Sequence, residues 1–170
     1  MKIFLKNIFL ISVIILSCIS CNSINESGVE IEKVVPADEV ISFFQKYFPV
    51  NSAPVLSECF FSNNGDKEDK CVIINSFDDF KKYFSCATNI LPEIDFNSYT
   101  LIIGQKLVPL LCDYDVEQKI VIISKTEAKL YLTWNCPERS YSSFNTLSYW
   151  GIYPKFYIKK IITNVVKKQV

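Results

Sequence analysis

Two short segments of the chain carry apolar residues at helical spacing. The first is residues 36–49, which lie between two prolines and predict a helix with one apolar stripe facing the core. That stripe consists of Val40, Phe43, Phe44, Tyr47 and Phe48. We expect Asp38 to cap this helix, because its carboxylate can accept hydrogen bonds from the free backbone N–H groups of the first turn.

The second predicted helix covers residues 76–86. Ser76 and Asp79 have the spacing of a capping box, with aspartate in place of the usual glutamate. Aromatic residues recur along this segment at the spacing of one helix face. Those expected to face the core are Phe77, Phe80 and Phe84.

Most of the remaining chain has the period of β-strands. In residues 128–136, three apolar residues alternate with three residues of more polar character, which predicts one buried and one solvent-facing side. The buried side is Leu130, Leu132 and Trp134, and the solvent-facing side is Lys129, Tyr131 and Thr133. Further strands are predicted at residues 98–111 and 118–124, and at 145–166 with a break near Pro154.

The dipeptide Asn64-Gly65 predicts a hairpin over residues 55–75, because both residues tolerate a positive φ. Folding the strands about Gly65 brings Cys59 opposite Cys71, which makes this pair a candidate for a cross-strand disulfide. The patterns together give about six or seven strands and two short helices. Successive strands with short connections indicate an antiparallel sheet or a partly open barrel in an α+β domain.

The N-terminus has a different pattern, with Lys2 and Lys6 followed by an apolar run over residues 8–16. This run is too short for a transmembrane helix and suits a signal peptide. With a small residue before each of two following cysteines, the segment resembles a bacterial lipoprotein signal with its lipobox. The resemblance implies cleavage before a cysteine that then carries lipid, including palmitate.

Two cysteines compete for the lipid. Cys18 follows Ile-Ile-Leu-Ser and fits the lipobox better, and Cys21 is the alternative. We therefore expect a signal peptide at residues 1–17, a flexible tether at 18–36 and one globular domain at 37–168. The protein would be lipid-anchored in the bacterial cell envelope, most simply at the outer membrane, on a face that the sequence leaves open.

The chain has seven cysteines, and the predicted compartment is one in which disulfides persist. If Cys18 carries lipid, six cysteines remain, one of them Cys21 in the tether; if Cys21 carries lipid, five remain and one thiol is left over. The disulfide candidates within the domain are Cys59, Cys71, Cys86, Cys112 and Cys136. Six cysteines can pair in 15 ways, so the sequence leaves the connectivity open.

Composition excludes several functions. The chain has no histidine, which removes the serine–histidine and cysteine–histidine nucleophile systems and histidine-based zinc sites. Lysines plus arginines equal aspartates plus glutamates at 18 each, so nucleic-acid binding has little support. We therefore expect no catalytic residues, no bound cofactor and no metal, and we predict that the protein is not an enzyme.

Acidic residues were weighed as candidate sites. Glu93 and Asp95 lie at strand spacing, but two carboxylates on one strand do not make a hydrolytic cleft, and we expect Asp95 to accept backbone hydrogen bonds at a strand entrance. Asp113, Asp115 and Glu117 alternate as calcium ligands can, yet the glycine and distant glutamate of an EF-hand loop are missing. A solvated turn is the simpler interpretation.

An aromatic cluster near the C-terminus is the candidate binding surface. Exposed aromatic side chains can stack on sugars or anchor a protein partner, and the alternative is that they fill the sheet core. The residues predicted to form this surface are Tyr149, Trp150, Tyr153 and Tyr157.

Three segments carry a resemblance to known families: CVIINSFDDFKKYF (71–84), LPEIDFNSYTLIIGQ (91–105) and YWGIYPKFYIKKI (149–161). They are similar to small uncharacterised lipoproteins of Gram-negative bacteria and, more distantly, to the C-terminal domain of protease-complex-associated PrcB proteins. The resemblance implies an envelope module that associates with proteases. We therefore predict a non-catalytic module that binds an envelope or secreted protein, with a glycan- or small-ligand-binding surface lipoprotein as the alternative.

Overall fold

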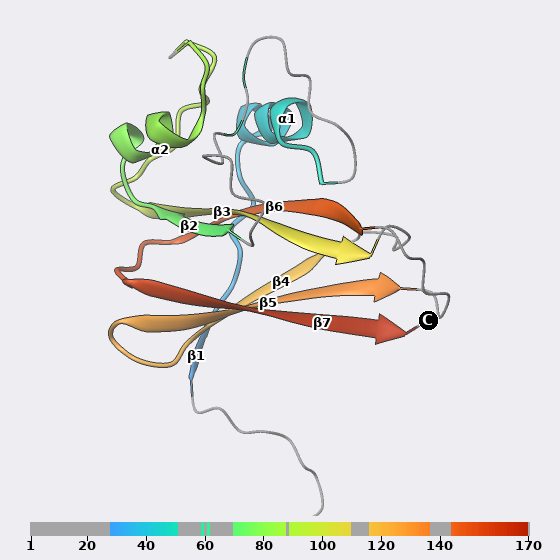
Figure 1. Ribbon diagram of the computed structural model, residues 1–170. Helices are drawn as coiled ribbons and strands as arrows, with labels where there is room; N and C mark the ends of the chain where they lie inside the picture. Colours follow the sequence, from blue (N-terminus) through green and yellow to red (C-terminus); the bar gives the residue numbers. More distant parts are fainter. Residues whose placement is uncertain are drawn as a thin grey trace, which may run out of the picture.

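The chain folds into three layers, with two helices above a three-stranded sheet and a four-stranded sheet below it (Figure 1). The computed structural model describes residues 28–50, 59, 61, 70–87, 89–109, 116–136 and 144–169. The helices are α1 (Asp38–Tyr47) and α2 (Phe77–Tyr83). The upper sheet has the order β2 (Lys70–Ile74), β3 (Tyr99–Pro109), β6 (Phe144–Pro154). The lower sheet has the order β1 (Val29–Ile31), β4 (Glu117–Ile122), β5 (Glu127–Cys136), β7 (Lys160–Gln169).

The predicted α+β class is confirmed, with the strands divided between two sheets that do not close into a barrel. Neighbouring strands are antiparallel except for β5 and β7, which pair in parallel from Glu127↔Lys160 to Cys136↔Gln169. This parallel pair differs from the antiparallel sheet that the succession of strands predicts. The parallel pair arises because β6 lies in the other sheet, so the chain reverses twice before β7 returns beside β5.

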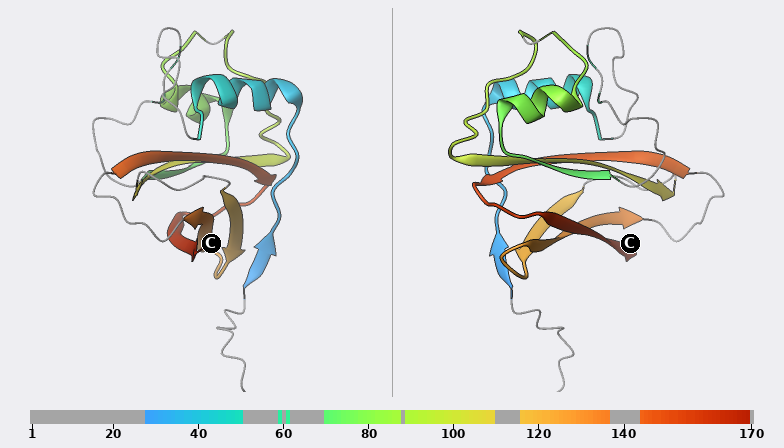
Figure 2. Two further views of the ribbon diagram at one scale, coloured as in Figure 1. Left: turned by 90° about the vertical axis from the view of Figure 1, so that its right-hand side faces the viewer. Right: turned by 60° about the vertical axis from the view of Figure 1, so that its left-hand side comes forward.

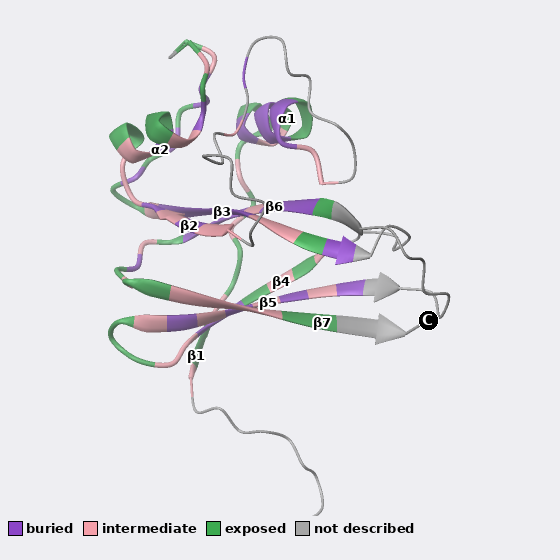
Figure 3. Cartoon of the chain, in the orientation of Figure 1, coloured by how far each residue is buried: buried purple, intermediate pink, exposed green. Residues whose placement is uncertain are grey.

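The central part of the three-stranded sheet is buried on both faces (Figures 2 and 3). In β3, Leu101 and Ile103 belong to the core beneath the helices, and Ile102 between them belongs to the core between the sheets. All three are fully buried. The alternation of a strand therefore supplies two separate hydrophobic cores from one run of apolar residues.

The predicted apolar stripe of α1 is confirmed, since all five of its residues are buried. Its cap is not Asp38: Ala37 is the N-cap, makes no side-chain hydrogen bond, and leaves Asp38 in the first turn. In α2 the capping role of Ser76 is confirmed, because Ser76 Oγ accepts from the backbone N–H of Asp79 at 3.1 Å, and the Asp79 carboxylate accepts from the Ser76 hydroxyl at 2.8 Å. Phe80 and Phe84 are buried, but Phe77 is 39% exposed at the rim of the helix layer, so that prediction is wrong.

The fold begins earlier than expected, inside the segment assigned to a tether. Residues 29–31 form β1 and pair with β4, from Val29↔Ile122 to Ile31↔Ile120. Further on, the N–H of Val34 donates to the carbonyl of Ile152 at 2.8 Å, so this stretch crosses the edge of β6 on its way to α1. The flexible tether can therefore include no more than the residues before Gly28.

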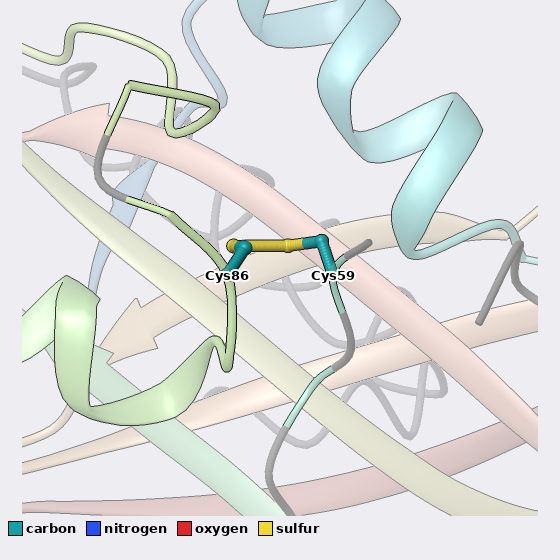
Figure 4. The surroundings of a disulfide bond; sticks show 2 residues. All are labelled: Cys59 and Cys86. Atoms are coloured by element: carbon teal, nitrogen blue, oxygen red, sulfur yellow. A yellow bond between two sulfur atoms is a disulfide. The ribbon is translucent and has the colours of Figure 1, made fainter. Parts of the chain in front are cut away.

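The disulfide prediction for Cys59 and Cys71 is wrong, because Cys59 pairs with Cys86 (Figure 4). Cys59 lies in the core beneath the helices and Cys86 packs against it. Cys71 is free and points from β2 into the core between the sheets. The two candidate partners thus lie on opposite faces of the upper sheet, in separate hydrophobic cores.

Several predictions fall outside the described residues. The Asn64-Gly65 turn, both candidate lipidation cysteines and Cys112 belong to this group, as does the side chain of Cys136. Of the predicted hairpin, the structure describes Phe61, which bridges to Phe84, and β2, which pairs with β3.

We expect Cys86→Ser to lower the free energy of unfolding by about 3 kcal/mol, because the disulfide closes a loop whose ends are 27 residues apart. Urea denaturation measures this loss, and Cys71→Ser, which breaks no disulfide, is the matched control. A non-reducing digest should yield a peptide linking Cys59 to Cys86. A peptide linking Cys59 to Cys71 would contradict the structure.

Candidate binding face on the four-stranded sheet

The outer face of the four-stranded sheet is the one sheet face that no described element covers (Figure 1). The helices shield the upper sheet from above, and the two sheets shield each other. The pairing of β4, β5 and β7 places nine side chains on the open side in three rows. We call them the binding face: Val121, Lys129 and Ile162; Lys119, Tyr131 and Asn164; Glu117, Thr133 and Val166.

Tyr131 stands at the centre of the binding face, with Lys119 and Asn164 on the strands to either side. The surface is hollowed here, with a volume of about 720 Å³ lined by residues of all three strands. Apolar side chains flank the tyrosine in the neighbouring rows, and Val166 is 42% exposed. At the rim, Lys119 Nζ meets Glu30 Oε2 at 2.5 Å, and both side chains are half exposed.

This arrangement suits contact with a large surface better than chemistry on a small molecule. Tyr131 lies at the centre, polar and charged side chains border it, and the other apolar side chains lie at three corners, a mixed composition that suits a non-obligate protein–protein interface. Tyrosine offers a rigid apolar ring with a polar tip, a combination favoured at the centre of such interfaces. Among the described residues, no three cysteine or acidic side chains gather closely enough to hold a metal ion.

The aromatic surface predicted near the C-terminus does not form. Tyr149 and Tyr153 are buried between the sheets, at 1% and 0% exposure, because β6 directs them away from the helices. Trp150 faces the helices and stacks on Phe44, with ring centroids 4.1 Å apart. Of the four predicted residues, Tyr157 alone is exposed, at 77%, in the connection from β6 to β7.

A small polar network accompanies the buried tyrosines. The hydroxyl of Tyr153 donates to Gln118 Oε1 at 3.3 Å, and Gln118 Nε2 donates to the carbonyl of Trp150 at 2.9 Å. Burial raises the pKa of Tyr153, and the nearby Cys71 adds to the rise. Burial also raises the pKa of the Cys71 thiol. These groups are neutral near pH 7, so the network tolerates its apolar surroundings.

The acidic candidates behave as structural or solvated residues. Asp95 Oδ1 accepts from the N–H of Asn97 at 3.0 Å, as expected at a strand entrance. Hydrogen bonds from Ser98 and Asn97 hold the pKa of the Asp95 carboxyl below its usual range. Asp95 and Glu93 line an open hollow of about 600 Å³ together with Glu39, a residue the sequence analysis did not consider. Asp113 and Asp115 lie outside the described residues, and Glu117 lies on the binding face.

Sequence reasoning missed Tyr131 as a functional candidate, although the signal was present. The alternation in β5 places an aromatic residue on the side predicted to face solvent, where apolar rings are not expected. What the alternation cannot show is whether another element covers that side. The structure supplies this information through the order of the layers.

The fold and the binding face define a three-layer α+β domain that leaves one sheet face open. Comparisons with models of protein families, with curated proteins and with solved structures each found no match. Neither α1 nor α2 has the length and apolar character that crossing a membrane requires.

Tyr153 gives a prediction about alkaline stability. Because its pKa is raised in the folded state, folding disfavours the ionised hydroxyl. The contribution of the neutral Tyr153 hydroxyl to the free energy of unfolding is complete below the ordinary tyrosine pKa of about 10. It is lost as the pH rises above that value, because the unfolded chain then ionises more readily than the folded one. Tyr153→Phe should therefore make stability fall less steeply at high pH, while costing about 1 kcal/mol at neutral pH through the lost hydrogen bond.

Denaturation at a series of pH values measures this effect. The matched control is Tyr157→Phe, an exposed position at which the slope should not change. Parallel curves for the wild type and Tyr153→Phe would show that Tyr153 does not oppose ionisation in the folded state.

Proposed function

We propose that this protein is a lipid-anchored module of the bacterial cell envelope that binds a partner protein through the binding face and catalyses no reaction. The anchoring part rests on the N-terminal pattern, in which a signal at residues 1–17 precedes a lipidated Cys18, or Cys21 in the alternative cleavage. The location is the outer membrane. The partner is an envelope or secreted protein.

One observation carries the binding part of the proposal: a tyrosine at the centre of a sheet face that no described element covers. A β-sheet normally buries at least one face, and a single open face is ordinary when its residues are polar. Here Tyr131 has Ile162 and Val166 in the neighbouring rows, both at least partly exposed, and Tyr131 and Val166 line the hollow. A partner that covers these groups would gain the free energy of burying them.

The resemblance to the PrcB C-terminal domain makes protease complexes the first partners to test. The segments that carry it contribute β2, α2, β3 and β6, which build the upper sheet and its helical cover. The resemblance therefore concerns the scaffold. The binding face lies on the other sheet, so its partner is a property of this chain's own residues.

The glycan-binding alternative loses the residues on which it depended. It required a concave surface lined by Tyr149, Trp150 or Tyr153, and two of these are buried between the sheets. A sugar could still stack on Tyr131, beside the polar side chains of Thr133 and Asn164. The experiment below distinguishes the two ligands.

Tyr131→Ala should abolish capture of the partner. The protein, solubilised in mild detergent and immobilised, is exposed to envelope extracts and secreted proteins, and the retained proteins are identified and quantified. Truncating a central interface tyrosine costs about 2 kcal/mol or more, or roughly thirtyfold in affinity. Tyr157→Ala is the matched control, because it removes an exposed tyrosine outside the binding face.

The proposal requires one retained protein that is lost with Tyr131→Ala and kept with Tyr157→Ala. If both variants retained the partner protein equally, the partner would bind at a surface other than the binding face, and the proposal would be wrong. Retention of glycans instead, measured with a panel of envelope saccharides and again lost with Tyr131→Ala, would favour the alternative. Urea denaturation of each variant shows whether the fold is intact.

A further inference from the structure

A second surface lies at the end of the lower sheet where β4 turns into β5. The backbone N–H groups of Lys159 and Lys160 both donate to the carbonyl of Thr126, at 3.0 and 3.1 Å. These bonds fix the connection from β6 to β7 against the turn that carries Lys125. We call this surface the basic end: Lys125, Tyr157, Lys159 and Lys160.

The basic end combines exposed positive charge with one exposed aromatic ring. Its three lysines are exposed, and Glu127 is the acidic residue beside them, 3.5 Å from Lys160. Tyr157 is 77% exposed, while Phe156 before it is buried and Ile158 after it packs against the core between the sheets. The neighbours anchor the segment, so the ring of Tyr157 is held outward. Lys155 Nζ lies 5.3 Å from its centroid.

The N-terminal strand enters the fold at this same end. Val29 pairs with Ile122, the last residue of β4 before the turn. A Cβ placed on Gly28 would lie 2.8 Å from the carbonyl oxygen of Ile122, so the backbone is close to the turn at that point. Whatever precedes Gly28 in the chain therefore leaves the domain next to the basic end.

Charge is divided between the outer layers, although the whole chain is neutral. The strands of the lower sheet and their adjoining connections, over residues 28–31, 117–134 and 159–166, carry five lysines and three glutamates. The helix layer, residues 37–50 and 76–98, carries six acidic residues and three lysines. The side on which the chain enters is thus the positive side.

We propose that the basic end docks on an anionic lipid surface. Lysines near such a surface are attracted to its headgroups, and tyrosine is favoured at the boundary between headgroups and acyl chains. The proximity of a membrane rests on the lipidation proposed above: nine residues separate Cys18 from Gly28, and the ten steps between these two span about 35 Å at most. The charge and the exposed ring are independent of that lipid.

Lysines at a sheet end also have an ordinary role, since they discourage edge-to-edge aggregation. That role does not require an exposed tyrosine, nor a lysine-rich end at the entry point of the chain. The experiment therefore asks whether the basic end contacts lipid and whether the contact depends on charge.

The purified lipidated full chain is placed in vesicles of phosphatidylcholine alone or with a third of phosphatidylglycerol. A water-soluble amine-reactive reagent then labels lysines, and mass spectrometry gives the labelling of each one. We expect labelling of Lys125, Lys159 and Lys160 to fall severalfold in the anionic vesicles. The helix-layer lysines Lys46, Lys81 and Lys82 should be labelled equally in both, and high salt should restore labelling at the basic end.

Two matched double variants test whether positive charge at the basic end causes the protection. In both, the labelling of Lys160 is the quantity that is measured. Lys125→Gln with Lys159→Gln should remove most of its protection, since each lysine near an anionic surface contributes roughly fivefold to binding. Lys81→Gln with Lys82→Gln makes the same change in net charge on the helix layer and should leave the protection intact. Tyr157→Ala should weaken it without changing its dependence on salt.

Equal labelling of the basic end in both kinds of vesicle would overturn the proposal, as would protection of the helix-layer lysines in its place. The vesicles contain no other protein, so the result does not depend on the partner of the binding face. The intact mass shows separately whether lipid is attached. A chain without lipid would overturn the proposed anchor. If that chain still sedimented with anionic vesicles and not with neutral ones, the docking proposal would be supported. If it sedimented with neither, the docking proposal would be overturned.

Discussion

The structure depends on a middle sheet that must be buried on both faces. Leu101, Ile102 and Ile103 are consecutive and fully buried, so this part of β3 has no side that faces water. A slip of one residue would exchange the two faces, and the register must therefore be fixed. Gly104 contributes to this, because it pairs with Tyr149 and a Cβ there would overlap the tyrosine ring. The ring fills space that only glycine leaves open.

Trp150 joins the three layers through its ring and its carbonyl. The ring stacks on Phe44 of α1, and Lys33 Nζ lies 4.9 Å from its centroid. The carbonyl accepts from Lys33 Nζ at 3.0 Å and from Gln118 of the lower sheet at 2.9 Å. The segment that leads from β1 to α1 is thereby held against both sheets. The contacts of Trp150 therefore fix both the path of the chain from β1 to α1 and the packing of α1 on the upper sheet.

The sequence predicted features that depend on neighbours along the chain and failed on features that depend on distant ones. The apolar period predicted both helices, Ser76 predicted the start of α2, and alternation predicted the two sides of β5. The pairing of Cys59 failed because opposition in a hairpin does not reveal which face of the sheet Cys71 occupies. The strand β1 was missed because three residues of mixed polarity carry almost no periodic signal. Tyr149 is buried because a second sheet covers it, and no local sequence pattern predicts that sheet.

The two proposed surfaces are compatible because the strands separate them. Tyr131 lies four residues beyond Glu127 along β5, and a strand rises about 3.3 Å per residue. The centre of the binding face therefore stands about 13 Å from the turn, measured along the strand. With the basic end on a lipid surface, the binding face is turned sideways and is raised above the headgroups. Docking would then help recognition, because it would fix the height and orientation at which the binding face meets a partner.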